Sequence, residues 1–270
     1  MQLLTFDQAG DRPRISGPTE NANQAASDLL AKRQLARDEA MLQWADQVVA
    51  EDSDTGLETE TLRVWSFERP TVVLGRSSKI DEEVNRSWCQ QNEVPVLRRC
   101  TGGASVVGGP GCWMYSVVLR LLDETSIRKV DVAHDYVMTR VLAAVRKQLP
   151  EAERQGICDL TYQNRKFSGN SLRVARHHLL YHGTLLMGAD LDLIQTCLEY
   201  APRQPEYRAK RDHRDFVGNI ELDIGRWTQD LAQQFAANTR GDRSVEHSVE
   251  TVANELLQTR YSDPQWHTRR

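Results

Sequence analysis

The hydrophobic positions in the first part of the chain predict one long helix followed by short strands. Helix-forming residues fill Asn21 to Ala50, with apolar residues at helical intervals. The acidic stretch Glu51 to Glu60 follows as a loop. β-branched and apolar residues then predict two strands, Thr61 to Phe67 and Thr71 to Leu74, which Pro70 divides. We expect these two strands to pair as a hairpin.

One helix between two strands is expected next. Ser78 can cap a helix in which Ile80, Val84 and Trp88 lie four residues apart on one amphipathic stripe. The run from Val94 to Arg98 then predicts a strand. We therefore expect a continuous helix through Trp88.

The middle of the chain is rich in predicted strand. Met114 to Leu122 is apolar and β-branched, and Val130 to Leu149 carries apolar residues at every fourth position until a proline ends the helix. Further strands are expected at Ile157 to Tyr162, from Lys166 onward, and at Leu179 to Met187. The sequence thus places most of the sheet in this region.

The remaining pattern defines the fold class. Gln163-Asn164 joins its flanking strands as a two-residue turn, and a helix is expected to start near Asp190. Amphipathic helices follow at Ile224 to Phe235 and Val245 to Leu257. Because strands and helices occur in mixed order without strict alternation, we expect an α+β fold with a mixed, largely antiparallel β-sheet flanked by helices.

Length and composition favour a single domain. We expect 1–20 to be an irregular N-terminal segment, 21–200 the core and 201–270 a helical C-terminal part, without a large accessory domain. Hydrophobic residues make up 40% of the 270 residues, enough to bury a core. The net charge of -4 and pI of about 6.0 give no reason to expect nucleic-acid binding. We see neither an export signal nor an apolar run that could span a membrane, so no membrane partner is expected.

Cysteine and histidine spacing bears on location and metal binding. The five cysteines are odd in number and include no CxxC pair, which fits free thiols in a reducing compartment, so we expect a cytoplasmic protein. His177, His178 and His182 include an i, i+4 pair, but that spacing brings ligands together in a helix, and this segment is expected to be extended. The sequence therefore predicts no metal site.

A glycine-rich segment follows the strand predicted to end at Arg98. Bare backbone N–H groups and two guanidinium groups could together bind a phosphate, such as the α-phosphate of a nucleotide. The spacing is neither GxGxxG nor that of a P-loop, and a simple turn between strands is the alternative interpretation. A second glycine cluster begins at Gly108, and close approach to a ligand is one explanation for it. The first segment reads Arg98-Arg99-Cys100-Thr101-Gly102-Gly103-Ala104-Ser105.

Lys166 is the candidate for charge chemistry. It lies between the Gln163-Asn164 turn and Ser168-Gly169-Asn170, so its ammonium can project from a strand into space left by the glycine. An exposed hairpin lysine is the ordinary alternative. His182 suits the rim of an apolar pocket, although it could equally be a core histidine. Cys158 is either a small buried hydrophobe or, as a minority interpretation, a nucleophile.

Four separated stretches, in this order, resemble the lipoate-protein ligase family of the biotin/lipoate ligase superfamily. The resemblance spans about residues 35 to 200, and the combination is specific although each piece is short. The stretches are Arg69-Pro70-Thr71-Val72-Val73-Leu74-Gly75-Arg76, Arg98-Arg99-Cys100-Thr101-Gly102-Gly103, Arg165-Lys166-Phe167-Ser168-Gly169-Asn170 and His182-Gly183-Thr184-Leu185-Leu186.

The resemblance implies a biotin/lipoate ligase catalytic domain with Lys166 as its catalytic residue. The residues it implies for ATP binding are Arg98, Gly102, Gly103, Ala104, Ser105, Val106 and Lys166. Those it implies for lipoate binding are Arg76, Lys166, Ser168, Gly169, Asn170, His182 and Gly183.

The implied chemistry has two steps. The lipoate carboxylate attacks the α-phosphate of ATP to give lipoyl-AMP, and a lysine amine of a lipoyl-carrier domain then takes the acyl group. Lys166 would stabilise charge in both steps, and Mg²⁺ would accompany the triphosphate. A separate small accessory protein is a further expected partner. This chain departs from the family pattern at Ala104, where a third glycine is common, and at Gly108-Gly109, where His-Asp is common.

Three other functions are weighed against ATP-dependent ligation. An ATP-independent octanoyl or lipoyl transferase would pass the acyl group through Cys158, although Cys158-Asp159-Leu160 resembles the ligases' Asn-Asp-Leu. A non-catalytic protein that only binds lipoyl domains is motivated by the altered glycine positions. Biotin ligation is disfavoured because Lys-Phe-Ser-Gly-Asn resembles the lipoate branch more closely.

Overall fold

A computed structural model describes residues 1–6, 20–52, 55–122, 126–200, 204–237 and 239–269. Most of the predicted irregular segment 1–20 lies outside these residues, and its start contains a short strand. The elements run β1 (Gln2–Leu3), α1 (Glu20–Glu51), β2 (Thr61–Ser66), β3 (Thr71–Leu74), α2 (Ile80–Glu83), α3 (Arg86–Gln91), β4 (Val96–Arg98), β5 (Val106–Gly108), β6 (Cys112–Arg120), η1 (Ser126–Arg128), α4 (Val130–Arg146), β7 (Glu153–Gln155), β8 (Asp159–Tyr162), β9 (Arg165–Ser168), β10 (Asn170–Val174), β11 (His178–Leu186), α5 (Leu191–Cys197), η2 (Glu206–Arg208), α6 (His213–Phe216), α7 (Ile224–Gln234), β12 (Thr239–Arg240), α8 (Arg243–Leu256), η3 (Leu257–Tyr261) and α9 (Pro264–Thr268).

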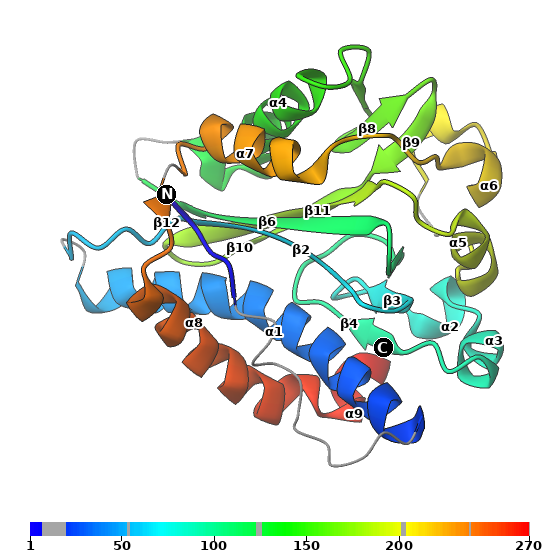
Figure 1. Ribbon diagram of the computed structural model, residues 1–270, viewed down its shortest axis with the longest axis horizontal. Helices are drawn as coiled ribbons and strands as arrows, with labels where there is room; N and C mark the ends of the chain where they lie inside the picture. The colour runs from blue at the N-terminus through cyan, green and yellow to red at the C-terminus, as the bar shows by residue number, and fades with distance from the viewer. Residues whose placement is uncertain (7–19, 53–54, 123–125, 201–203, 238, 270) are drawn as a thin grey trace.

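A six-stranded sheet of order β10-β11-β6-β2-β1-β12 forms the centre of the molecule. The pairs from β10 to β2 are antiparallel, whereas β1 runs parallel to both β2 and β12. Helices α1 and α8 cover one face of this sheet, and α4 and α7 cover the other (Figure 1). The expected α+β fold, with a mixed and largely antiparallel sheet flanked by helices, is confirmed.

Strand alternation divides the buried side chains into two hydrophobic cores. On β6, Met114 and Val118 belong to the core under α1 and α8, whereas Tyr115 and Val117 belong to the core under α4 and α7. Full burial of each aliphatic side chain contributes about 1.5–3 kcal/mol. Both faces of the central strands are therefore covered, which explains why β6 is almost continuously apolar.

The predicted hairpin of the second and third strands is wrong. β2 has β1 on one edge and β6 on the other, so neither edge is open to β3. β3 instead forms a separate sheet of order β4-β3-β5, parallel to β4 and antiparallel to β5. All four residues of β3 are buried, as a covered central strand requires.

The predicted continuous helix through Trp88 is also wrong. Val84 is extended, with φ -132°, and bridges to Leu198, so α2 ends there. Asn85 then caps α3 by accepting from the Trp88 N–H at 3.2 Å. Ser78 caps neither helix, since the N-cap position of α2 is Lys79. The bridge from Val84 to a distant segment outweighs the local helical pattern.

The hairpin that carries Lys166 is confirmed. Gln163 (φ 49°) and Asn164 (φ 59°) form the two-residue turn between β8 and β9, and two positive φ values are the signature of a tight hairpin. β8 begins at Asp159, two residues later than expected, because Cys158 lies in the preceding turn. Lys166 is therefore held on a short sheet, β7-β8-β9, beside the main one.

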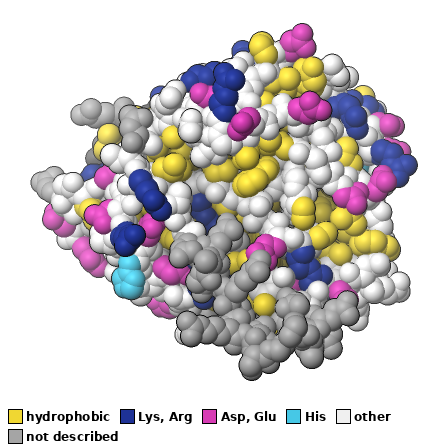
Figure 2. Space-filling view, viewed as in Figure 1, with side chains coloured by type: hydrophobic (Ala, Val, Ile, Leu, Met, Phe, Trp, Pro, Cys, Tyr) yellow, Lys and Arg dark blue, Asp and Glu magenta, His cyan; other side chains and the backbone are white. Residues whose placement is uncertain are grey.

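The C-terminal part packs on the same central sheet. α7 contacts α4, and α8 contacts α1. Asp223 and Asp242 cap these two helices through their carboxylates. Among the helices that the structure describes, none could cross a membrane. Positive and negative side chains are interspersed over the face drawn in Figure 2, apart from what the grey atoms cover.

Candidate functional site

Lys166 is held in an ion pair at the edge of the sheet. Its Nζ lies 2.8 Å from Asp159 Oδ1, and its side chain is 26% exposed. The Tyr207 hydroxyl donates to Asp159 Oδ2 at 2.7 Å, and burial together with the nearby Asp159 raises the pKa of Tyr207. A Cβ on Gly169 would lie 2.9 Å from Lys166 Nζ, so the glycine gives the ammonium its space. We call Lys166, Asp159 and Tyr207 the lysine cluster.

Asn170 joins this cluster to the main sheet. Its amide donates to the Cys158 carbonyl at 2.6 Å and to Ser168 Oγ at 3.1 Å. Its Oδ1 accepts from the hydroxyl of Tyr115, whose pKa burial raises well above the usual value, so the hydroxyl remains a donor. A Cβ on Gly183 would lie 1.7 Å from Asn170 Oδ1. The Asn170 side-chain amide therefore lies in the space that a side chain at position 183 of β11 would occupy, which favours glycine there.

Cys158 lies next to the cluster as a protonated thiol. Its Sγ donates to the Asn170 carbonyl at 3.1 Å. Burial raises the pKa of Cys158 to about 11, with Asp159 adding to the rise and Lys166 opposing it. A thiol of this pKa carries little thiolate at neutral pH.

The glycine segment is held by Arg99. Its Nε donates to Thr101 Oγ1 at 3.0 Å, its Nη1 to Val73 O at 3.1 Å, and its Nη2 to the carbonyls of Gly102 and Ala104. Burial lowers the pKa of this guanidinium to about 10. Arg99 thus stabilises the conformation of the glycine segment through hydrogen bonds to its backbone and to Thr101.

Arg98 binds the C-terminal part of the chain. Its Nη2 donates to the carbonyls of His267 at 3.1 Å and Arg269 at 2.7 Å. Its Nη1 donates to Gly75 O at 2.8 Å and to Ser78 O at 2.7 Å. The residue is fully buried. Its guanidinium therefore joins two segments of the chain through hydrogen bonds to their backbone carbonyls.

Ser105, another residue predicted to bind nucleotide, contacts the buried carboxylate of Glu83. Glu83 Oε2 accepts from the Ser105 N–H at 2.9 Å and from Ser105 Oγ at 2.7 Å. Ala104 is exposed, and Val106 begins β5. Arg76 is exposed and donates its backbone N–H to Thr101 O at 2.7 Å. The structure thus places Arg76 beside the glycine segment.

His182 lies in a buried chain of four side chains, which we call the histidine chain. Its Nδ1 is 3.0 Å from Asp38 Oδ2, and its Nε2 is 2.6 Å from Thr101 Oγ1 and 3.1 Å from Ser171 Oγ. The two hydroxyl oxygens are 2.9 Å apart. The chain therefore connects α1, β11, β10 and the glycine segment.

Asn170 and His182 lie on opposite faces of the sheet. Asn170 pairs with Gly183 and Ser171 with His182, so neighbouring side chains alternate between faces. Asn170 contacts Tyr115, which packs against Trp227 of α7, whereas His182 contacts Asp38 of α1. The predicted lipoate residues therefore divide into two groups rather than lining one surface.

Packing within the chain explains why glycine stands at position 108, where the family commonly has histidine. A Cβ there would lie 2.4 Å from Phe67 Cδ2 and 2.8 Å from Met114 Cε. Gly111 likewise faces the backbone of Gly188, at 2.3 Å from its carbonyl carbon. This second glycine cluster is thus accounted for by contacts with the chain itself.

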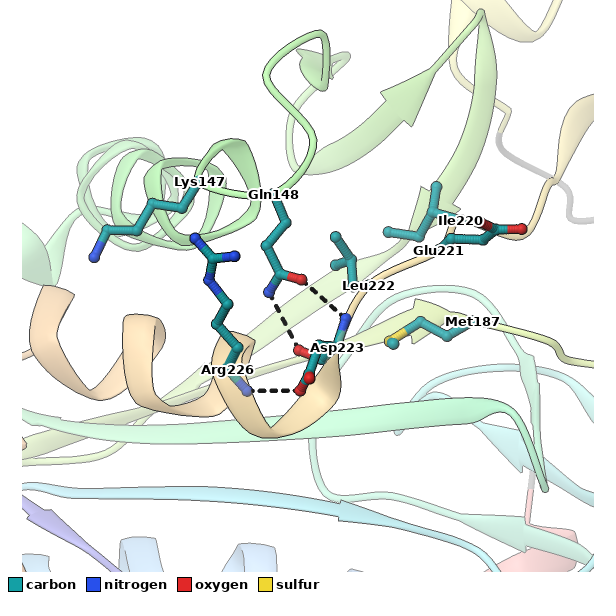
Figure 3. A pocket seen from close by; sticks show the side chains of 8 residues that line it. All are labelled: Lys147, Gln148, Met187, Ile220, Glu221, Leu222, Asp223 and Arg226. Atoms are coloured by element: carbon teal, nitrogen blue, oxygen red, sulfur yellow. Dashed lines mark hydrogen bonds between the residues drawn. The ribbon is translucent and has the colours of Figure 1, made fainter.

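The sequence interpretation missed several partners of the predicted residues. Asp159 and Thr101 stand in quoted motifs, so their positions offered a signal, but Asp38, Ser171 and Tyr207 offered none. A hollow of about 540 Å³ lies elsewhere, where Gln148 pairs with the backbone of Asp223 (Figure 3). None of its lining residues is a predicted site residue; they are Lys147, Gln148, Met187, Ile220, Glu221, Leu222, Asp223 and Arg226.

Residues 32–239 match the lipoyl protein ligase A/B catalytic domain. The chain is 25% identical over 211 residues to lipoate-protein ligase LplJ of Bacillus subtilis, which covers 73% of this chain and 61% of that protein. It is 25% identical over 164 residues to lipoate-protein ligase 1 of Staphylococcus aureus, which covers 60% of this chain and 48% of that protein. The chain thus spans less than two thirds of both ligases.

A third relative has a similar length to this chain. Octanoyltransferase LipM of Halalkalibacterium halodurans is 21% identical over 268 residues, which cover 87% of this chain and 94% of that protein. Among solved structures, a bipartite lipoate protein ligase of Thermoplasma acidophilum superposes with a TM-score of 0.70 at 20% identity, covering 99% of this chain and 95% of that chain. A lipoate-protein ligase A bound with ATP gives a TM-score of 0.68 at 20% identity, covering 88% and 94%. These structures establish the likeness of fold.

Proposed function

Because the chain belongs to the lipoyl protein ligase A/B family, we propose that it is an ATP-dependent lipoate-protein ligase. The lipoate carboxylate attacks the α-phosphorus of ATP, the bond to pyrophosphate breaks, and lipoyl-AMP forms. The amine of a lysine on a lipoyl-carrier domain then attacks the acyl carbon. An amide bond forms, AMP leaves and the amine loses its proton.

The observation that carries this proposal is the geometry of Lys166. Its ammonium is partly exposed, oriented by Asp159 at 2.8 Å, and given room by Gly169. A positive charge held in this way can stabilise the negative charge that develops on phosphate and acyl oxygens. The low thiolate content of Cys158 supports adenylate chemistry over a thioester route.

The proposal requires Glu83 to move. Its carboxylate occupies the Ser105 N–H and hydroxyl, which are donors that a phosphate would use. Nucleotide binding would displace this carboxylate. Within the described residues, no three His, Cys, Asp or Glu side chains form a group suited to a metal ion. The proposal therefore places Mg²⁺ on phosphate and water rather than in a protein cage.

The proposed partners are a lipoyl-carrier domain and a separate small accessory protein. The similar Thermoplasma acidophilum structure is a bipartite ligase with its E2 lipoyl domain. We further propose that residues 1–270 form one catalytic domain of a protein that works in the cytoplasm. In such a bipartite arrangement, the accessory protein would assist the adenylation step.

A direct assay tests the proposal. The protein is incubated with ATP and lipoate, octanoate or biotin, with and without candidate accessory proteins, and lipoyl-AMP and pyrophosphate are measured. Lys166→Ala is expected to lower kcat/KM about 100-fold or more. Lys147→Ala is the matched control, since Lys147 Nζ also pairs with a carboxylate, Asp230 Oδ1, at 2.9 Å. Absence of adenylate from the unsubstituted protein under all conditions would contradict the proposal.

A thiol route through Cys158 is the second candidate. Cys158 lies next to the lysine cluster, where its Sγ donates to the Asn170 carbonyl, and the octanoyltransferase relative is similar to this chain in length. The Cys158 thiolate would attack a donor thioester and release the donor thiol. A carrier lysine would then attack the acyl-cysteine and restore the thiol. An acylated mass with octanoyl-coenzyme A as donor, absent in Cys158→Ser, would favour this route.

A further inference from the structure

The guanidinium of Arg98 is saturated by backbone carbonyls of the chain itself. Its Nε donates to Trp266 O at 3.2 Å, and its Nη2 donates to the carbonyls of His267 and Arg269. Its Nη1 donates to two carbonyls of the turn at 75–78, at 2.8 and 2.7 Å. An arginine side chain has five N–H hydrogens. All of them are therefore directed at carbonyls of the described residues rather than at a phosphate.

Side chains of α9 complete the open edge of β4. This strand lies at the edge of the sheet β4-β3-β5, and α9 packs against it (Figure 1). The backbone N–H of Arg98 donates to His267 Nδ1 at 2.9 Å, and its carbonyl accepts from Trp266 Nε1 at 2.9 Å. The Nε2 of His267 in turn donates to Tyr261 O at 2.8 Å. Two backbone groups that an edge strand would expose are thus bound by α9.

The end of α9 supplies the carbonyls that a buried cation needs. The last carbonyls of a helix have no partner within the helix, and they carry partial negative charge. They offset the cost of burying Arg98, whose pKa is lowered by burial and by the nearby Arg269. The guanidinium groups of Arg269 and Arg260 pack on the Trp266 ring, at 3.8 and 4.9 Å from its centroid. These contacts fix α9 beside Arg98.

The turn at 75–78 connects Arg98 to the glycine segment. A backbone N–H of this turn donates to Thr101 O at 2.7 Å, and Ser78 Oγ donates to Gly103 O at 3.3 Å. A Cβ on the first residue of the turn, a glycine, would lie 1.9 Å from Gly103 O. The turn and the glycine segment are therefore packed backbone to backbone. A shift of Arg98 would move both.

We propose that Arg98 is a positioning residue for the substrates of adenylation and that α9 is the element that fixes it. Arg98 holds the turn at 75–78 against α9, and this turn supports Gly102-Gly103 in the conformation that receives the substrates. The role takes the place of direct contact between Arg98 and phosphate. It rests on the proposed function, because it requires ATP and lipoate to bind beside the glycine segment. Both substrates are included because Arg76, a predicted lipoate residue, belongs to the same turn.

Kinetics of lipoyl-AMP formation by the full chain test the role. Trp266→Ala removes the indole that bonds the Arg98 carbonyl. We expect the KM values for ATP and lipoate both to rise about 10-fold, with kcat lowered less than about threefold. His267→Leu removes the acceptor of the Arg98 N–H and should have the same effect. His267→Asn should retain the original KM values, because its Oδ1 can accept in place of Nδ1.

Val249→Ala is the matched control. Val249 is fully buried in α8, in the core beneath α1, and its side chain is apolar. Its truncation should lower stability through the cavity that it leaves. A smaller folded fraction lowers the apparent kcat but leaves KM unchanged. Equal rises in KM for Val249→Ala and Trp266→Ala would show a general loss of structure and would overturn the proposal.

A further variant separates positioning from direct contact with substrate. Arg98→Gln removes the guanidinium, and the proposal expects it to raise the same two KM values as Trp266→Ala does. If Arg98→Gln raises them while Trp266→Ala and His267→Leu leave them unchanged, Arg98 contacts substrate directly and the positioning role is wrong.

Hydrogen exchange gives a readout that does not depend on turnover. Amides in 75–78 and 99–105 should exchange at least about 10-fold faster in Trp266→Ala than in the unsubstituted protein, and less than about twofold faster in Val249→Ala. Unchanged exchange in Trp266→Ala would show that α9 does not hold the glycine segment, and the proposal would fail. If exchange rises as expected but the unsubstituted protein forms no lipoyl-AMP, the link through Arg98 stands and the proposed function fails instead.

Discussion

At the scale of single residues, contacts within the chain decide which glycines near the site can be replaced. A Cβ on Gly183 would meet Asn170 Oδ1 at 1.7 Å and Tyr115 Cε1 at 2.8 Å. A Cβ on Gly102 would meet nothing within 4 Å. The amide of Asn170 can move, but the fully buried Tyr115 ring has no space to do so.

Gly183→Ala is therefore expected to lower the free energy of unfolding by about 1–3 kcal/mol, the usual cost of overpacking. It should also lower acyl transfer, because Asn170 must leave its position between Cys158 and Tyr115. Urea denaturation measures the first effect. Gly102→Ala serves as the stability control and should change the free energy of unfolding by less than about 0.5 kcal/mol. Equal losses in both variants would contradict the prediction.

His178 makes stability depend on pH. Its ring is fully buried, and burial lowers its pKa from 6.5 to about 4. A depressed histidine pKa means that the unfolded chain binds the proton more tightly. The contribution of neutral His178 to the free energy of unfolding is therefore complete above pH 6.5, and it is lost as the pH falls toward about 4. We expect a loss of about 2 kcal/mol between pH 7 and pH 5 from this residue.

Denaturation of the unsubstituted protein and of His178→Gln across this pH range checks the prediction. Glutamine can still bond the Thr59 hydroxyl but cannot take up a proton there. The difference in unfolding free energy between the two proteins should shrink as the pH falls. A pH-independent difference would show that His178 does not titrate as expected.

At the scale of elements, the β8–β9 hairpin positions Lys166 through an unfavourable turn residue. Gln163 adopts φ 49°, a left-handed conformation that costs a non-glycine residue about 1 kcal/mol. Asn164, at φ 59°, is of a type that tolerates this region. The sequence predicted this turn because local chemistry determines a two-residue hairpin.

Gln163→Asn combined with Asn164→Gly should raise the free energy of unfolding by several tenths to about 1 kcal/mol, since Asn-Gly suits this turn type. Thermal and urea denaturation provide the measurement. Asn164→Val should have the opposite effect, because a β-branched residue is strained at positive φ. Destabilisation by the Asn-Gly pair would show that the Gln163 side chain stabilises the turn by more than the strain costs.

At the scale of the whole molecule, Glu39 joins three distant segments. Its buried carboxylate accepts from Arg173 of β10 at 2.6 Å, from Arg260 of η3, and from the Tyr261 hydroxyl at 2.9 Å. Burial acts to raise the pKa of Glu39, but hydrogen bonds and charge from Arg260 and Arg173 outweigh it, so the pKa is lowered. This residue links α1, the sheet and the C-terminal helices.

Glu39→Gln should lower the free energy of unfolding by about 3 kcal/mol at pH 7, because it leaves two arginines without their shared carboxylate. A lowered carboxyl pKa gives stability that is complete above the unfolded value of 4.5 and is lost as the pH falls through the folded value. The difference between variant and unsubstituted protein should therefore narrow below pH 4.5. Urea titrations at several pH values measure it, and a difference that widens in acid would contradict the assignment.

The amino-acid sequence by itself determined the long first helix, the β8–β9 hairpin, the amphipathic C-terminal helices and the mixed α+β class, because periodicity and turn chemistry act locally. It also marked Lys166, but gave no sign of Tyr207, whose hydroxyl donates to Asp159, the ion-pair partner of Lys166. Only the tertiary structure decided that β2 and β3 belong to different sheets, because strand pairing depends on which strand edges remain open. It likewise decided that Arg98 clamps C-terminal carbonyls and that Asn170 and His182 face opposite sides of the sheet, because these contacts join residues far apart along the chain.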